Sequence, residues 1–249
     1  MDLRFSTAEE AFRREVRDFL ETSLARPEFE ALRGRGGPGD EHACFEPRQA
    51  WERHLGAAGY IGLGWPRAYG GRDATLVEQV IFHEEYARAR APGRIGHIGE
   101  MLLAPTLLHF GSEAQKQRFL PGIRTGDALW CQGYSEPDAG SDLANVHTRA
   151  VREGDEWVVT GQKTWTSHGQ WADYAFVLCR TNVEAPRHAA LSYLLVLAVG
   201  GGGTSDGGGP GGAGFFGGGA GGKSTGSGGV AAAAVRAGST SVRSTPTRT

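Results

Sequence analysis

The amino-acid composition changes sharply near residue 199, and this change limits where the chain can build a core. Of the 40 glycines in the 249-residue sequence, 19 lie in residues 199–249, and that segment has no Leu, Ile, Trp or Tyr. So little apolar surface cannot offset an ordering cost of about 1–2 kcal/mol per residue. We therefore expect a globular body at residues 1–198 and a disordered, low-complexity tail at residues 199–249.

The charge and hydropathy of the body exclude several classes of protein. Residues 1–198 hold 22 basic and 27 acidic residues, which disfavours a nucleic-acid binder that relies on a basic field. The most apolar run, residues 189–199, is too short for a membrane helix of about 20 residues. The N-terminal sequence shows no secretory signal. Three well-separated cysteines and no metal-ligand spacing predict a cytoplasmic protein with buried thiols and no metal site.

Residues 6–126 show the periodicity and the start signals of helices. Capping boxes are predicted at Ser6-Thr7-Ala8-Glu9 and Thr75-Leu76-Val77-Glu78, and Ser112 is expected to cap a short final helix. Residues 97–109 are apolar nearly all round, so we expect a buried helix there, interrupted at Pro105. The final helix is expected to end before Pro121, because proline disrupts a helix interior.

After Gly126 the apolar pattern changes to that of strands. Residues 146–150 and 157–160 flank Glu153-Gly154-Asp155 and predict a hairpin. Residues 174–179 and 191–199 are apolar on both faces, as buried strands are. Helices followed by strands predict an α+β body, with a helical domain at 1–127 and a β domain at 128–198.

Two glycine-rich stretches match phosphate-binding patterns, but we expect neither to bind a nucleotide. Residues 217–224 fit G-x-x-x-x-G-K-[ST], yet the residues on either side cannot supply the required strand and helix. Residues 34–39 fit G-x-G-x-x-G but follow a predicted helix, and Pro38 removes an amide.

Two polar segments in the β region carry groups that suit a flat, hydrogen-bonding ligand. Residues 130–142 form a loop rich in hydroxyls and glycine where helices give way to strands. Residues 161–167 pair the indole of Trp165 with the hydroxyls of Thr166 and Ser167. An indole face stacks well on a flat heterocycle. By themselves, these segments are also compatible with an ordinary turn and with a core tryptophan at a strand end.

Together the two segments resemble the acyl-CoA dehydrogenase family of flavoproteins. The stretch Tyr134-Ser135-Glu136-Pro137-Asp138-Ala139-Gly140-Ser141-Asp142 is similar to the family signature, and Gly161-Gln162-Lys163-Thr164-Trp165-Thr166-Ser167 is similar to its second flavin segment. Residues 64–71 and 111–116 resemble the family's N-terminal-domain loop and last-helix entry. The likeness covers roughly residues 5–197.

The resemblance implies a helical N-terminal domain and then a β-barrel middle domain that holds FAD, here expected to be partial. It implies that Gln132, Tyr134 and Ser135 line the flavin, and that Ser141 contacts FAD or the CoA part of the substrate. It also implies that Trp165 packs on the flavin and that Thr166 and Ser167 bond it. Ser135 stands where many members have Thr, which keeps the hydroxyl.

The family chemistry is α,β-dehydrogenation of an acyl-CoA thioester, usually in a homo-oligomer; whether this chain assembles stays open. The resemblance places the catalytic glutamate in a C-terminal helical domain, so no catalytic base is assigned in this sequence. A tail of Gly, Ala, Arg, Pro, Ser and Thr is what GC-rich DNA encodes out of frame. We therefore expect a frameshifted or truncated, inactive product. Alternatives are a flavin-binding remnant, an acyl-CoA oxidase or a flavin monooxygenase-like relative.

Overall fold

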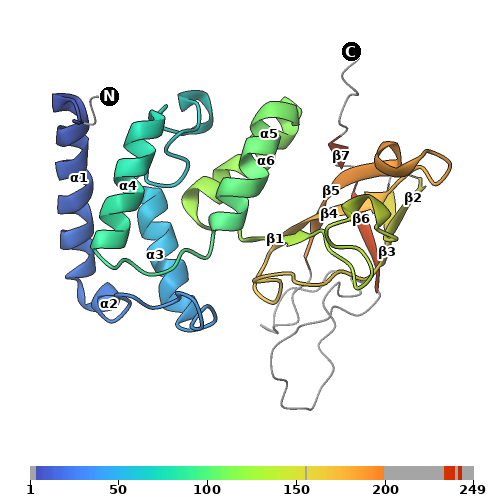
Figure 1. Ribbon diagram of the computed structural model, residues 1–249, viewed down its shortest axis with the longest axis horizontal. Helices are drawn as coiled ribbons and strands as arrows, with labels where there is room; N and C mark the ends of the chain where they lie inside the picture. Colours follow the sequence, from blue (N-terminus) through green and yellow to red (C-terminus); the bar gives the residue numbers. More distant parts are fainter. Residues whose placement is uncertain (1–3, 155, 199–232, 239–240, 243–249) are drawn as a thin grey trace. The chain divides into compact units, whose positions relative to one another are not determined.

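The computed structural model describes residues 4–154, 156–198, 233–238 and 241–242. The chain divides into two compact units (Figure 1). The helical unit comprises Met1–Glu100 and Gln117–Asp127, and the sheet unit comprises Met101–Lys116 and the chain from Ala128 onward. The helical segment 101–116 is thus part of the same compact unit as the sheet.

Two of the long helices begin at capping boxes that the sequence supplies. The α-helices are α1 (Thr7–Leu24), α2 (Pro27–Glu30), α3 (Phe45–Ala57), α4 (Leu76–Arg88), α5 (Ala104–Phe110) and α6 (Glu113–Thr125). Shorter elements are η1 (Arg67–Tyr69), the π-helix η2 (Ile98–Leu103), η3 (Leu143–Asn145) and η4 (Arg187–Ala190). Both capping boxes predicted for α1 and α4 are present, with Ser6 and Thr75 as the capping residues.

Two expectations for the later helices were wrong. The helix α6 continues through Pro121 to Thr125 instead of ending before the proline; a proline this near the C-terminal end interrupts only the last turns. The segment 97–109 is interrupted next to Pro105, as expected, where the π-helix η2 gives way to α5. Its expected burial was wrong, because Met101 and Leu102 are 58% and 46% exposed.

The helical unit has a core built from the apolar faces of α1, α3 and α4. Residues such as Val16, Leu20, Trp51, Leu55 and Ile81 are fully or almost fully buried in it. Glu85 of α4 receives salt bridges from Arg13 and Arg17 of α1 and from Arg88 of its own helix. Apolar packing and these ion pairs together fix α1 against α4.

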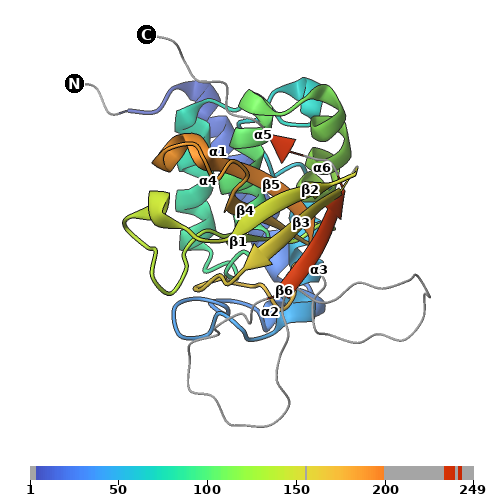
Figure 2. The same ribbon diagram turned by 90° about the vertical axis from the view of Figure 1, so that its right-hand side faces the viewer.

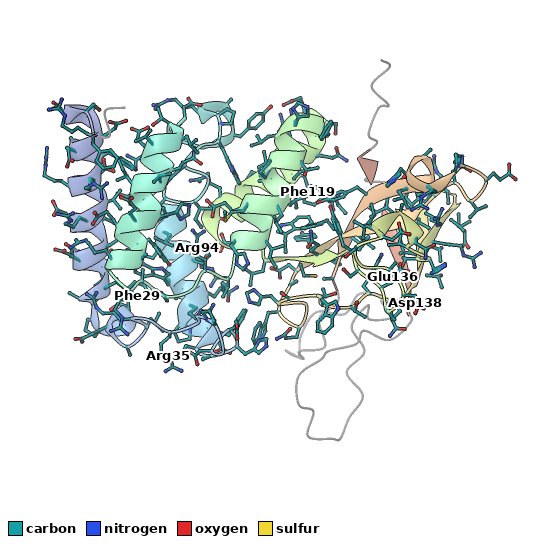
Figure 3. The ribbon with its side chains drawn as sticks, viewed as in Figure 1. Phe29, Arg35, Arg94, Phe119, Glu136 and Asp138 are labelled. Carbon is teal, nitrogen blue, oxygen red and sulfur yellow. The ribbon has the colours of Figure 1, made fainter. Side chains whose placement is uncertain are left out.

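A second polar cluster of the helical unit surrounds Arg94 (Figure 3). Its guanidinium contacts Glu52 at 2.5 Å and Glu100 at 2.6 Å, and Glu100 accepts the amide of Gly62 at 2.7 Å. The two carboxylates compensate the buried positive charge, as a buried ion needs. This cluster joins α3, the loop before α4 and the start of η2.

The sheet unit holds a mixed sheet (Figure 2). Its described strands run in the order β6-β3-β2-β4-β5-β7, with β1 paired to β4. They are β1 (Trp130–Gly133), β2 (Arg149–Glu153), β3 (Glu156–Gly161), β4 (Tyr174–Arg180), β5 (Leu191–Leu197), β6 (Ala233–Gly238) and β7 (Ser241–Val242). The predicted hairpin is present as β2 and β3. The described strands form a mixed sheet, and no closed barrel is seen among them.

The strand β4 lies at the centre of this sheet and pairs with both β1 and β2, which a loop connects. β1 pairs in parallel with Tyr174–Val177, and β2 pairs in parallel with β4 only at Arg180. The chain between β1 and β2, residues 134–148, therefore leaves the sheet and returns to the same strand a few residues along. This excursion contains most of the loop singled out in the sequence.

The glycine-rich segment lies mostly outside the described residues, including the phosphate-loop pattern at 217–224. We expected no regular structure after residue 198, and two short described segments differ from this. β6 pairs with the free edge of β3 and β7 with β5. Main-chain hydrogen bonds account for such pairing, because an open sheet edge presents unpaired amides and carbonyls.

Candidate functional site

The two polar segments predicted to form a site are held together in the sheet unit. The amide of Thr164 donates to the carbonyl oxygen of Ser135 at 2.8 Å. The ammonium of Lys163 donates to the carbonyl oxygen of Tyr134 at 2.9 Å and to Oε1 of Glu136 at 3.0 Å. Residues 134–136 and 163–164 are therefore neighbours, although they lie far apart in the sequence.

Glu136 is the centre of the contacts between these segments. Its carboxylate also accepts the amides of His147 at 2.5 Å and Thr148 at 2.8 Å. Burial by itself would raise the pKa of Glu136, but the hydrogen bonds from Thr148, the His147 amide and Lys163 outweigh it and lower the pKa. Glu136 is therefore a buried carboxylate that stays ionised.

Lys163 is one of the most deeply buried charged side chains in the described residues, with 1% of its surface exposed. Burial lowers its pKa, and Glu136 opposes that shift. Gly161, two residues before Lys163, packs against Thr148, and any side chain at Gly161 would collide with it. The glycine therefore lets the end of β3 lie close to the return of the loop, where Glu136 accepts the Thr148 amide. Neither Glu136 nor Lys163 was assigned a role from the sequence.

Trp165 stands two residues after Lys163, but its side chain is exposed where that of Lys163 is buried. Its side chain is 76% exposed, and its backbone has a φ of 57°, in the left-handed region that favours glycine. A bulky residue held in that region is strained, and such strain concentrates at ligand sites. An exposed, strained indole is available to stack on a flat ligand, and this exposure excludes the alternative of a core tryptophan at a strand end.

Two hydroxyls next to Trp165 lack hydrogen-bond partners. The Oγ1 atoms of Thr164 and Thr166 are buried and make no hydrogen bond within the described part of the chain. A buried hydroxyl without a partner costs free energy. A ligand with acceptor or donor edges would satisfy it. Ser167 is exposed, and its amide donates to the carbonyl oxygen of Trp165 at 3.1 Å.

The first polar segment, residues 130–142, contributes half-buried groups near residues 163–167, which we call the Trp165 corner. Gln132 lies in β1 opposite Phe176 of β4. The ring of Tyr134 lies edge-on to Phe176 and Tyr193, and its hydroxyl interacts with that of Tyr193. Burial raises the pKa of Tyr134, so its phenol is neutral near pH 7. Ser135 is half-buried, next to the contacts with Lys163 and Thr164.

Ser141 lies beyond a tight turn of the same loop. The turn is closed by paired backbone hydrogen bonds between Glu136 and Ala139. Asp138 is exposed at its tip, whereas Glu136 is buried; both are labelled in Figure 3. Ser141 is exposed, and the following Asp142 pairs with Arg187 at 2.6 Å. The place of Ser141 at the site rests on the resemblance.

The described residues carry no candidate membrane-crossing helix. They also hold no group of three or more His, Cys, Asp or Glu side chains that could bind a metal. Of the three cysteines, Cys131 and Cys179 are buried as expected, and Cys44 is half-buried. Burial raises the pKa of both buried thiols to about 12, which keeps them protonated and unreactive.

The comparisons with protein families divide the chain between residues 127 and 131. Residues 6–127 match the model described as "Acyl-CoA dehydrogenase, N-terminal domain", and residues 131–206 match "Acyl-CoA dehydrogenase, middle domain". Together the two models cover most of the sequence.

The curated relatives and solved structures point the same way. Acyl-CoA dehydrogenase IpdE1 of Mycobacterium tuberculosis is 56% identical over 187 residues, which is 75% of this chain and 48% of the relative. The ChsE4-ChsE5 complex of M. tuberculosis matches with a TM-score of 0.68 and 38% identity, over 80% of this chain and 49% of that one. The Tcur3481-Tcur3483 steroid ACAD matches with a TM-score of 0.67 and 39% identity, over 79% and 49%. The chain spans about half the length of these proteins.

Proposed function

This chain belongs to the acyl-CoA dehydrogenase family, and we propose that its sheet unit binds FAD for the α,β-dehydrogenation of an acyl-CoA thioester. The observation that carries the proposal is the corner at Trp165, where an exposed indole stands beside buried hydroxyls that lack partners. Stacking and hydrogen bonding at one edge are what a flavin ring requires.

We propose the flavin contacts of these residues as the resemblance implies them. Trp165 stacks on the flavin, while Thr166 and Ser167 donate hydrogen bonds to it. Ser135 bonds the ring edge, Gln132 and Tyr134 line the same surface, and Ser141 contacts FAD or the CoA part of the substrate. When bound, FAD supplies the acceptor for the hydride that leaves the β-carbon.

The proton on the α-carbon requires a carboxylate base, and we assign none among the described residues. Glu136 is occupied by Lys163 and two backbone amides, and a carboxylate with a lowered pKa is a poor base. Asp142 is paired with Arg187. We therefore propose that the flavin site is built here and that the base comes from residues beyond those described.

The relatives suggest a substrate class and an assembly. One structural neighbour is described as a steroid ACAD, so an acyl-CoA with a steroid-derived acyl group is a first substrate to test. Another is a complex of two named proteins. We propose that this chain also works in an assembly, in which a further domain or chain completes the reaction.

Titration of the full chain with FAD tests the proposal. We expect a yellow, folded protein whose flavin fluorescence is quenched on binding. Added acyl-CoA should leave the flavin band unbleached when the chain is alone. Bleaching would contradict our assignment of the base to residues outside those described. A folded chain that binds no FAD would contradict the flavin site itself.

A further inference from the structure

We propose that the buried ion pair of Glu136 and Lys163 is the positioning device that shapes the flavin corner, so that FAD affinity depends on both side chains although neither is assigned a flavin contact. This inference rests on the proposed function. It adds two positioning residues to that site and gives the buried pair a role beyond stability.

The pair ties the start of the loop, which follows β1, to the return of the loop and the end of β3, which the β2–β3 hairpin already holds side by side. Glu136 fixes the return of the loop through the amides of His147 and Thr148, and Lys163 fixes the start of the loop through the carbonyl oxygen of Tyr134. The salt bridge at 3.0 Å links these two sets of contacts. One pair of side chains therefore sets the spacing between the loop and the end of β3.

The groups that would meet the flavin flank this pair in the sequence. Ser135 precedes Glu136, and Thr164, Trp165 and Thr166 follow Lys163 directly. The hydrogen bond from the Thr164 amide to the Ser135 carbonyl lies between the two sets. Any change in the distance from Glu136 to Lys163 must move Ser135 relative to the strained backbone of Trp165.

A purely stabilising role is a weak explanation for this pair. Replacing a buried ion pair with apolar residues of similar volume is often neutral or favourable for stability, because both charges lose their hydration on burial. The pair's contacts are also concentrated on loop backbone, where they fix geometry. Precise placement of ligand-contacting groups by surrounding side chains is the usual requirement for a tight site.

The test uses the full chain and the variants Glu136→Gln, Lys163→Met and the double variant. Three quantities are measured for each: the FAD dissociation constant, the absorption spectrum of the bound flavin, and the melting temperature without FAD. Glu153→Gln is the matched control, because Glu153 is an exposed glutamate of β2 in the same unit. It should leave all three quantities unchanged.

Each single variant should bind FAD about tenfold more weakly or worse, a loss of about 1.4 kcal/mol, and should melt at a lower temperature. The double variant separates the two roles. Because it leaves no buried charge unpaired, its melting temperature should recover towards that of the unsubstituted chain, while its FAD affinity and flavin spectrum should stay perturbed. Recovery of both affinity and spectrum would overturn the inference and leave the pair a stabilising one.

Hydrogen exchange without FAD supplies a second readout. Exchange of the Thr164, His147 and Thr148 amides should accelerate in both single variants and in the double variant, since each loses the tie between loop and strand. Unchanged exchange in variants that bind FAD normally would overturn the positioning role alone. Failure of the folded, unsubstituted chain to bind FAD would overturn the proposed function as well.

Discussion

The helical unit and the sheet unit both bury charged side chains, but the surroundings of those charges differ. In the helical unit, Glu85 and Arg94 lie among partners of opposite charge that join helices and loops. In the sheet unit, the buried pair of Glu136 and Lys163 lies beside an exposed, strained Trp165 and hydroxyls that lack partners. The contrast teaches where to look for a ligand site: beside buried groups whose hydrogen-bonding capacity is unmet, more than beside buried charge.

The largest expected effect comes from cutting into the helical core. Leu20→Ala removes a fully buried side chain of α1 and should lower the free energy of unfolding by about 2–5 kcal/mol. Leu76→Ala makes the same chemical change at a side chain that is 76% exposed, and should cost less than about 0.5 kcal/mol. Denaturant unfolding followed by far-UV circular dichroism measures both. Equal effects would contradict the burial that defines this unit.

The next effect concerns the ion pairs that join α1 to α4. The arginines around Glu85, Arg17 foremost, lower the pKa of its carboxyl to about 2. A lowered folded-state pKa gives stability that is complete above the unfolded value of about 4.3 and is lost as the pH falls towards 2. Glu85→Gln should cost about 1–3 kcal/mol at neutral pH and should flatten the fall in melting temperature over that acid range. An unchanged acid profile would show that Glu85 does not carry it.

In the sheet unit, Trp165→Ala should separate binding from stability. The exposed indole contributes little to folding, so the free energy of unfolding without FAD should change by less than about 0.5 kcal/mol. FAD binding should weaken by about 1–3 kcal/mol, on the scale of base–aromatic stacking. Isothermal titration with FAD measures the loss, and Trp165→Phe should restore part of it. Full affinity in the alanine variant would remove Trp165 from the site.

The smallest effect is expected at Thr166. Thr166→Val keeps the shape of the side chain and removes a buried hydroxyl that has no partner within the described residues. Stability without FAD should stay the same or rise, because no hydrogen bond is lost. FAD affinity should fall by about 0.5–1.5 kcal/mol, and Thr166→Ser should retain it. A loss of stability in the valine variant would show that the hydroxyl already has a partner.

The helical unit was the more predictable of the two. The capping boxes at Ser6 and Thr75 and the apolar face of α1 depend on residues three or four apart, so a single sequence displays them. The errors arose where tertiary context decides. α6 continues past Pro121, and Met101 and Leu102 of η2 are exposed despite an apolar sequence.

The candidate site was predictable only in part. The hydroxyls and Trp165 were found because they stand in motifs that resemble a known family. Glu136 and Lys163 stand in the same motifs, but their pairing joins positions 27 residues apart, and no local periodicity reports such a contact. The parallel pairing of β1 and β2 to the same strand, which creates the loop, is also a property of the assembled sheet.

The central claim is that FAD binds at the corner shared by residues 134–142 and 163–167 of the sheet unit. Hydrogen exchange of the full chain, followed by mass spectrometry with and without saturating FAD, tests it most directly. The account predicts that FAD slows exchange in these two segments and leaves that of α1 unchanged. Protection confined to other segments, or none at all in a folded chain saturated with FAD, would contradict it.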